Sequence, residues 1–396
     1  MAASAPARES TRYDELEAYR GVAALLIVVF HAYQHSRAMF TYVYQGTPIN
    51  VVLQNLDATV AWFFVLSGFL ITLPFARAMV RQDQAQSTRG FLIRRAIRIV
   101  PLYYTAILIV WTLRYTGGPG QWQDLGLHLS FTQVFNRTHI FWTIGPAWSL
   151  AVEAQFYLGI ALLAPLAFRA CRRLSSANAR LALLGMGTLL FAATSLAYKW
   201  WALNQGHIAD GNYPVYYGPV AKMDTFAFGV GLALVVTAVG KKPLLGGIVP
   251  TLARLAGLAI LAADFLLRQH YAWVNLYFHT ISGLGFTLFL ASTVLAPRGT
   301  WWERFLNQAP LQFLGLISYS IYMWHEPIMI WLADQRLVSF ETLSGFPLAA
   351  LTLVMLSVLA GSISYWMVEY PISMLRYVFT RSGHLVDRYA QARVVR

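Results

Sequence analysis

The sequence predicts an all-α, polytopic membrane protein with about ten transmembrane helices, and three observations support this fold class. The 396 residues are 57% hydrophobic and only 12% charged, with a mean hydropathy of +0.51, so there are too many apolar side chains for a water-soluble core. Apolar runs of roughly 20 residues, enough to cross a bilayer, recur along most of the chain. No long polar stretch separates them, which indicates one membrane domain.

The predicted membrane domain covers 18–371, between a polar N-terminal tail at 1–17 and a polar C-terminal tail at 372–396. The spans are expected, in order, at 18–36, 57–76, 94–115, 147–168, 182–203, 215–238, 252–268, 273–296, 311–333 and 347–370. The first apolar run contains Arg20 and His31, and no small-residue cleavage site follows it. It is therefore expected to stay in the mature protein rather than to be removed as a signal peptide.

The basic residues predict how these spans are oriented. With ten spans both termini lie on one side, and most of the 30 lysine and arginine residues fall in segments on that side. Positively charged loops resist translocation, so both termini are predicted to be cytoplasmic. The net charge of +13 is then mainly a topology signal, and its spread along the chain argues against nucleic-acid binding. A single cysteine, Cys171, excludes an internal disulfide and a cysteine-based metal cluster.

The first predicted span places Arg20 and His31 on one face. At about 100° per residue their separation is three turns plus about 20°, with about 16 Å along the axis. The arginine would lie at the cytoplasmic mouth and the histidine near mid-membrane. This arrangement suits an extended ligand with an anionic end and a reactive end. The alternative is a topology anchor together with a histidine that forms hydrogen bonds in the core.

The third predicted span begins with FLIRRAIRIVPLYY, which places Arg94, Arg95 and Arg98 at the cytoplasmic entrance. Guanidinium groups bind phosphate oxygens in pairs, and the start of a helix favours an anion. The cluster therefore predicts a phosphate-binding site. The alternative is a plain topology determinant that contacts lipid phosphates.

The fourth predicted span begins with PAWSLAVEAQFYL, where Ser149, Glu153 and Tyr157 follow at i, i+4 and i+8. They form one polar stripe among apolar residues. A carboxylate inside a membrane is costly unless a cation or a histidine is near it, so Glu153 is a candidate functional residue. A structural ion pair with an arginine is the alternative.

Later spans carry further polar residues. KMDTFAFGVG places Lys222 and Asp224 in the sixth span, and ISYSIYMWHEPIM places Ser318, Tyr322 and His325 on one face of the ninth. Each set could line a polar cavity, but structural pairing is favoured over catalysis. The same holds for three other acidic residues in spans, Asp57, Asp264 and Glu369. No phosphate-binding glycine loop, HExxH motif or GxSxG elbow is present, and no metal site is predicted.

Taken together, these motifs resemble those of the acyltransferase 3 family of bacterial membrane O-acyltransferases. The segments that carry the resemblance are Arg20-x10-His31, WFFVLSGFLIT at 62–72, RRAIRIVPLYY at 94–104, WSLAVEAQFY at 148–157 and ISYSIYMWHEP at 317–327. They occur in order from the first span to the ninth and cover most of the chain. The first motif departs from the family's common DGLRG, because this chain has EAYRG at 17–21.

The resemblance implies about ten spans. It also implies the transfer of an acyl group, with acetyl as the first candidate, from acyl-CoA to a hydroxyl group. The acceptor would be a glycan, a glycolipid or a glycosylated natural product such as a macrolide. The resemblance further implies His31 as the essential histidine with Arg20 as its partner, Arg95 and Arg98 as the pair near the acyl-CoA, and Ser149 and Glu153 on the fourth helix.

The expected mechanism assigns roles to two groups of residues. His31 would act as general base, and Glu153 would orient its ring or stabilise the imidazolium. The residues expected to hold the phosphates of acyl-CoA are Arg20, Arg94, Arg95 and Arg98. The residues expected to support catalysis or the acceptor side are Ser149, Tyr157, Lys222, Asp224, Tyr322 and His325. Direct transfer and an acyl-enzyme route are both compatible with these residues.

Acyl-CoA would be a co-substrate, and no permanently bound cofactor is predicted. The expected location is the bacterial cytoplasmic membrane, and a homo-oligomer is compatible with the sequence. The alternative function is a proton-coupled transporter or flippase of an envelope precursor. Its proton relay would use His31, Glu153, Lys222 and Asp224. That function explains the charges within the spans but not the arginine cluster.

Overall fold

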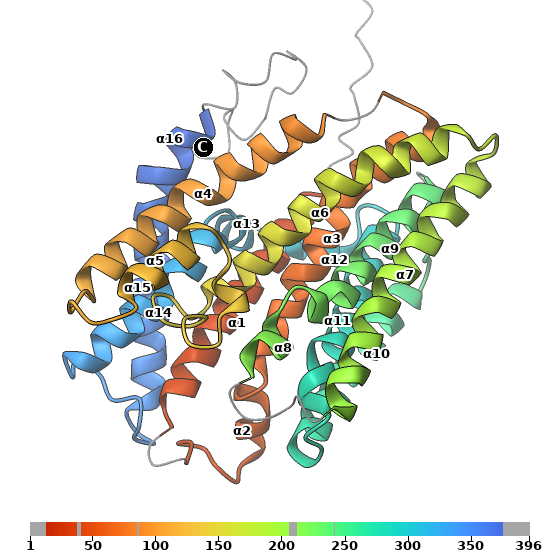
Figure 1. Ribbon diagram of the computed structural model, residues 1–396. Coiled ribbons are helices and arrows are strands. Elements are labelled where there is room, and N and C mark those ends of the chain that lie inside the picture. Colours follow the sequence, from red (N-terminus) through yellow and green to blue (C-terminus); the bar gives the residue numbers. More distant parts are fainter. Residues whose placement is uncertain (1–12, 38–40, 85–86, 206–211, 241, 375–396) are drawn as a thin grey trace, which may run out of the picture.

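The computed structural model describes residues 13–37, 41–84, 87–205, 212–240 and 242–374. All secondary-structure elements within these ranges are helices, as predicted. The predicted N-terminal tail lies mostly outside the described residues, as does the predicted C-terminal tail. The long helices form one bundle, with the start of α4 and the end of α16 at the same end of it (Figure 1).

The predicted spans overlap ten long helices among the described residues, but the span predicted at 311–333 is divided at Ile317 into α13 and α14. Their bounds are α1 Glu15–His35, α3 Thr59–Arg81, α4 Thr88–Leu113, α6 Ala147–Arg172, α7 Ala177–Asn204, α9 Met223–Val239, α10 Val249–His270, α11 Val274–Val294, α14 Ser318–Asp334 and α15 Phe346–Ser364. The shorter helices are α2 Pro48–Leu53, η1 Leu56–Ala58, α5 Gln121–Leu129, η2 Gln133–Phe135, α8 Tyr213–Tyr217, η3 Val220–Lys222, α12 Trp301–Leu306, α13 Ala309–Leu316, η4 Tyr365–Glu369 and α16 Tyr370–Met374.

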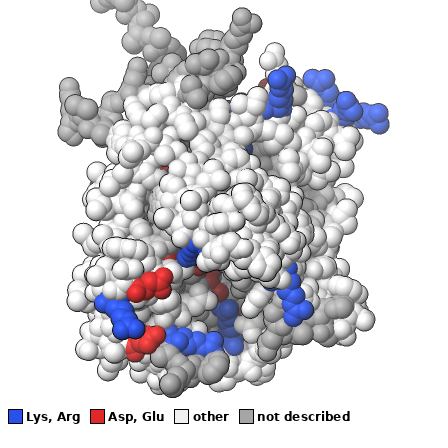
Figure 2. All heavy atoms as spheres, turned by 60° about the vertical axis from the view of Figure 1, so that its left-hand side comes forward, with Lys and Arg blue, Asp and Glu red and all other residues white. Residues whose placement is uncertain are grey.

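The outer surface of the bundle is suited to lipid. In the described part of the chain, nine helical stretches are long and apolar enough to cross a membrane. Helix α14, with 17 residues, is not among them and follows directly after α13. Figure 2 shows charged side chains near the upper and lower ends of one face, with a broad belt of other residues between them. Helices α7 and α15 expose large apolar side chains, among them Met186, Leu189, Leu190, Leu351, Met355 and Leu359. Only lipid can cover such a surface without cost.

Helix α3 lies at the centre of the bundle. Of its most apolar stretch 72% is buried, against 6% for α7. It packs against α1, α6, α9 and α11. Its contact with α9 is close because glycines face the opposite backbone. A Cβ on Gly229 would lie 2.1 Å from the carbonyl oxygen of Val65, and one on Gly68 would lie 2.4 Å from that of Phe226. Small residues of this kind let membrane helices approach each other.

We expect Gly229→Val to lower the midpoint of thermal unfolding in detergent, because α3 and α9 must move apart to admit the side chain. Overpacking of this kind costs about 1–3 kcal/mol. Gly231→Val is the matched control, since a Cβ on Gly231 of the same helix meets nothing within 4 Å. Equal midpoints for the two variants, measured by scanning fluorimetry, would contradict the close contact.

A second close contact sets the position of Arg20. A Cβ on Gly315 of α13 would lie 2.1 Å from the carbonyl oxygen of Glu17, and one on Gly21 would lie 2.8 Å from the carbonyl carbon of Leu314. The backbones of α1 and α13 therefore touch on either side of Arg20. This contact holds the arginine beside the start of α14.

Candidate active site

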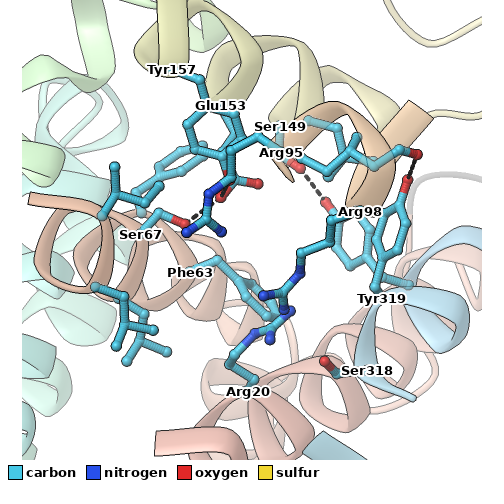
Figure 3. A pocket seen from close by; sticks show the side chains of 17 residues that line it. Arg20, Phe63, Ser67, Arg95, Arg98, Ser149, Glu153, Tyr157, Ser318 and Tyr319 are labelled. Atoms are coloured by element: carbon cyan, nitrogen blue, oxygen red, sulfur yellow. Dashed lines mark hydrogen bonds between the residues drawn. The ribbon is translucent and has the colours of Figure 1, made fainter. Parts of the chain in front are cut away.

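A cavity lies between α1, α3, α4, α6 and α14, and most of its polar lining comes from the sequence motifs (Figure 3). The polar lining residues are Arg20, Ser67, Arg95, Arg98, Ser149, Glu153, Tyr157, Ser318, Tyr319 and Tyr322. The apolar lining residues are Phe63, Phe64, Leu66, Leu70, Ile71, Ile99 and Leu150. The structure thus brings together predicted site residues that are far apart in the sequence.

Two arginines face one another across this cavity. Arg20 of α1 and Arg98 of α4 point toward each other (Figure 3). Arg20 donates a hydrogen bond of 3.1 Å to Glu17 on its own helix. Among the described residues, the guanidinium of Arg98 forms no hydrogen bond or ion pair. Like charges at such a site repel, and an anion between them would remove the repulsion.

Arg95 is held by aromatic rings rather than by a carboxylate. Its guanidinium carbon lies 5.8 Å from the ring centroid of Phe91 and 5.6 Å from that of Tyr157. Cation–π contacts of this kind use no N–H group, so those of Arg95 remain available to a ligand. Arg94, the fourth predicted acyl-CoA residue, does not line the cavity. The other three arginines do.

Glu153 is fixed by two hydroxyl groups. Its Oε1 accepts hydrogen bonds from Ser67 of α3 and from Tyr157 one turn along α6. The stripe predicted from spacing within α6 is therefore real, but its partner on α3 was not predicted. Ser67 precedes Gly68, the glycine at which α3 approaches α9. A serine next to a glycine that packs against another helix is the signal in the sequence that could have indicated Ser67.

A partition of two aromatic residues closes the cavity on the side of the histidines. Tyr322 forms a hydrogen bond of 2.7 Å with Ser149 and donates one of 3.0 Å to the carbonyl of Pro146. Its ring centroid lies 5.9 Å from that of Phe63 and 5.7 Å from that of His325. We call Phe63 and Tyr322 the aromatic partition.

His31 lies beyond the aromatic partition and does not line the cavity. Its Nδ1 is 3.0 Å from the carbonyl oxygen of Ile27 and 3.1 Å from Nε2 of His325. The two imidazole centroids are 4.9 Å apart. The expected contact of His31 with Glu153 is not present, because the Glu153 carboxylate bonds the two hydroxyls inside the cavity. His325 is the side chain that contacts the ring of His31 in its place.

Lys222 and Asp224 belong to a second polar cluster between α7, α9 and α11, away from the cavity. Asp224 pairs with Lys199 at 2.6 Å, and Thr280 bonds both groups. Lys222 lies 2.7 Å from Nδ1 of His279. The other acidic residues also have partners, namely Asp57 with Arg268, Asp264 with Ser282 and Glu369 with Ser320. Each of these residues thus has a polar partner, as a structural pairing requires.

The fold and the site define the class of this protein, a multi-pass helical membrane protein with an arginine-rich cavity beside a pair of histidines. A family model described as an acyltransferase domain matches residues 13–367, and the chain belongs to this family, acyltransferase 3. The match covers almost all of the described residues and confirms the resemblance drawn from the motifs.

Curated relatives carry related names. The O-acetyltransferase OatA of Staphylococcus aureus (strain NCTC 8325 / PS 47) is 25% identical over 358 residues, which cover 82% of this chain and 55% of the relative. The putative O-acetyltransferase SACOL0978 of Staphylococcus aureus (strain COL) is 22% identical over 341 residues, covering 79% of this chain and 50% of the relative. The chain thus spans about half the length of the curated relatives it matches. No solved structure matches it.

Proposed function

We propose that this protein is an O-acyltransferase of the bacterial cytoplasmic membrane that takes an acyl group from acyl-CoA, with acetyl as the first candidate. The observation that carries the proposal is that two of the cavity arginines have no carboxylate partner. Arg98 and Arg95 reach the cavity, and among the described residues neither guanidinium bonds a carboxylate. Arg20 faces Arg98. Coenzyme A carries a pyrophosphate and a further phosphate, and guanidinium groups bind such oxygens in pairs.

The position of the cavity fits a donor that enters from one end of the bundle. Arg20 lies near the start of α1, and Arg95 and Arg98 lie in the first turns of α4, which is the end predicted to be cytoplasmic. His31 lies about 16 Å further along α1. The thioester at the far end of the pantetheine arm would therefore have to displace a side chain of the aromatic partition to reach the histidine, while the phosphates stay at the arginines.

The proposed reaction is a direct transfer with His31 as general base. Nε2 of neutral His31 accepts the proton of the acceptor hydroxyl while the hydroxyl oxygen attacks the thioester carbonyl. The new C–O bond forms, the C–S bond breaks, and the proton on His31 passes to the sulfur of CoA. General base catalysis of this kind contributes about 10²–10⁴-fold to the rate.

The acceptor is proposed to be a hydroxyl of a glycan, a glycolipid or a glycosylated natural product. The curated relatives are named O-acetyltransferases, which supports a hydroxyl as the acceptor group. The His31 side chain is half-buried. In this proposal the acceptor approaches it from the side away from the arginine cavity. The two substrates would thus meet at His31 from opposite sides.

Binding of radiolabelled acetyl-CoA to the purified protein in detergent tests this function. We expect saturable binding that excess CoA displaces and that acetyl-pantetheine, which lacks the phosphates, displaces far less well. Labelled acetyl groups should then appear on an added hydroxyl acceptor or, slowly, in water. No binding and no turnover with several acyl-CoA donors would contradict the proposal and favour proton-coupled transport.

A further inference from the structure

The two histidines beyond the aromatic partition form hydrogen bonds whose directions follow from their partners. Nδ1 of His325 lies 3.2 Å from the carbonyl oxygen of Ile321, and Nδ1 of His31 lies 3.0 Å from that of Ile27. A carbonyl oxygen only accepts, so each Nδ1 carries the hydrogen. In a neutral imidazole the other nitrogen then carries a lone pair. Each ring is therefore the Nδ1–H tautomer.

These tautomers make the contact between the rings favourable. The lone pair on Nε2 of His325 faces Nδ1–H of His31 at 3.1 Å. His31 thus shares one N–H between His325 and the carbonyl of Ile27. Neither contact uses Nε2 of His31, which is left with a lone pair. That nitrogen is the one a general base needs.

His325 is well placed to hold a second ring still. It is fully buried, at 0% exposure. The helix that carries it is fixed on both sides of the histidine. Tyr322 bonds Ser149 on α6, and the carboxylate of Glu326 accepts a hydrogen bond of 2.6 Å from the backbone N–H of Gly145. These contacts tie α14 to the segment that leads into α6 and fix the direction of the His325 ring.

We infer that His325 is a positioning residue for acyl transfer, which holds His31 as the Nδ1–H tautomer so that its Nε2 faces the acceptor hydroxyl. This inference rests on the proposed function, in which His31 is the base. When Nε2 of His31 takes the hydroxyl proton, the ring becomes an imidazolium, and Nε2 of His325 accepts a stronger hydrogen bond from its Nδ1–H. His325 gains and loses no proton over the cycle.

Two variants of His325 test this role. His325→Leu removes the acceptor and is expected to lower kcat about 10–100-fold, the usual effect of losing a residue that orients a reactive group. Binding of acetyl-CoA and its KM should not change, because the cavity arginines remain in place. His325→Gln keeps an oxygen acceptor near the position of Nε2 and should recover a large part of the lost kcat. Wild-type kcat in His325→Leu, or no recovery in His325→Gln, would overturn the inference.

A spectroscopic measurement on the wild-type protein tests the same point without a variant. With ¹⁵N-labelled histidine, His31, assigned by its loss in His31→Gln, should show the Nδ1–H tautomer in its neutral form. A dominant Nε2–H form would overturn the inference. A different result contradicts the proposed function: full activity in His31→Gln. Lost activity in His31→Gln together with normal activity in His325→Leu leaves the proposed function standing and removes only the role of His325.

Discussion

Replacing His31 with glutamine is expected to lower acyl transfer about 10²–10⁴-fold, the contribution of a general base. Glutamine has an amide in place of the imidazole and cannot take up the hydroxyl proton. Binding of acetyl-CoA should persist, because His31 does not line the arginine cavity. The measurement is the rate of transfer of labelled acetyl in a single turnover, at a donor concentration that saturates the protein.

His35→Gln is the matched control for this variant. His35 lies one turn further along α1 and packs edge-on against Phe340, with ring centroids 5.4 Å apart. No side-chain hydrogen bond or ring contact joins His35 to the His31–His325 pair among the described residues, so its replacement should leave transfer unchanged. Two results would count against the role of His31: full transfer by His31→Gln, or loss of acetyl-CoA binding in that variant.

Replacing Arg98 with glutamine is expected to weaken acetyl-CoA binding roughly 10–100-fold. Hydrogen bonds to charged groups contribute about 1.5–3 kcal/mol each, and about 1.4 kcal/mol corresponds to a factor of ten. Arg98 forms no hydrogen bond or ion pair with the described residues, so the hydrogen bonds that the variant loses are those to the ligand. The dissociation constant of labelled acetyl-CoA measures the effect, and binding of acetyl-pantetheine should change little.

Arg94→Gln is the matched control for Arg98→Gln. It tests whether ligand binding depends on the arginines that line the cavity or on any arginine of the cluster. Arg94 lies one turn before Arg98 on α4 and outside the cavity lining, so its replacement is expected to leave binding within about twofold. Equal losses of binding in the two variants would assign the cluster to topology and not to the ligand.

The predictions from the sequence succeeded where a single helix contained all the information. All ten predicted spans coincide with helices, because backbone groups in lipid must bond within their own segment and a long apolar run can do so only as a helix. The stripe of Ser149, Glu153 and Tyr157 also follows from the helical period alone, and all three line the cavity.

The contacts between helices were decided by the tertiary structure. The sequence did not predict Ser67 as a partner of Glu153, and it placed Glu153 where the structure has His325 beside His31. It also could not separate Arg94 from its neighbours, because that depends on how α4 is rotated about its axis.

The physical reason lies in how the helices meet. Hydropathy and period determine that a segment crosses the membrane and which residues share a face. The rotation and depth of one helix against the next depend on backbone contacts such as those at Gly229 and Gly315, where the space for a single Cβ is absent. The sequence by itself determined the spans, the family and most of the polar residues of the site. Only the packed bundle decided which of these residues touch, and so which arginines line the cavity and which nitrogen of His31 is left without a hydrogen-bond partner among the described residues.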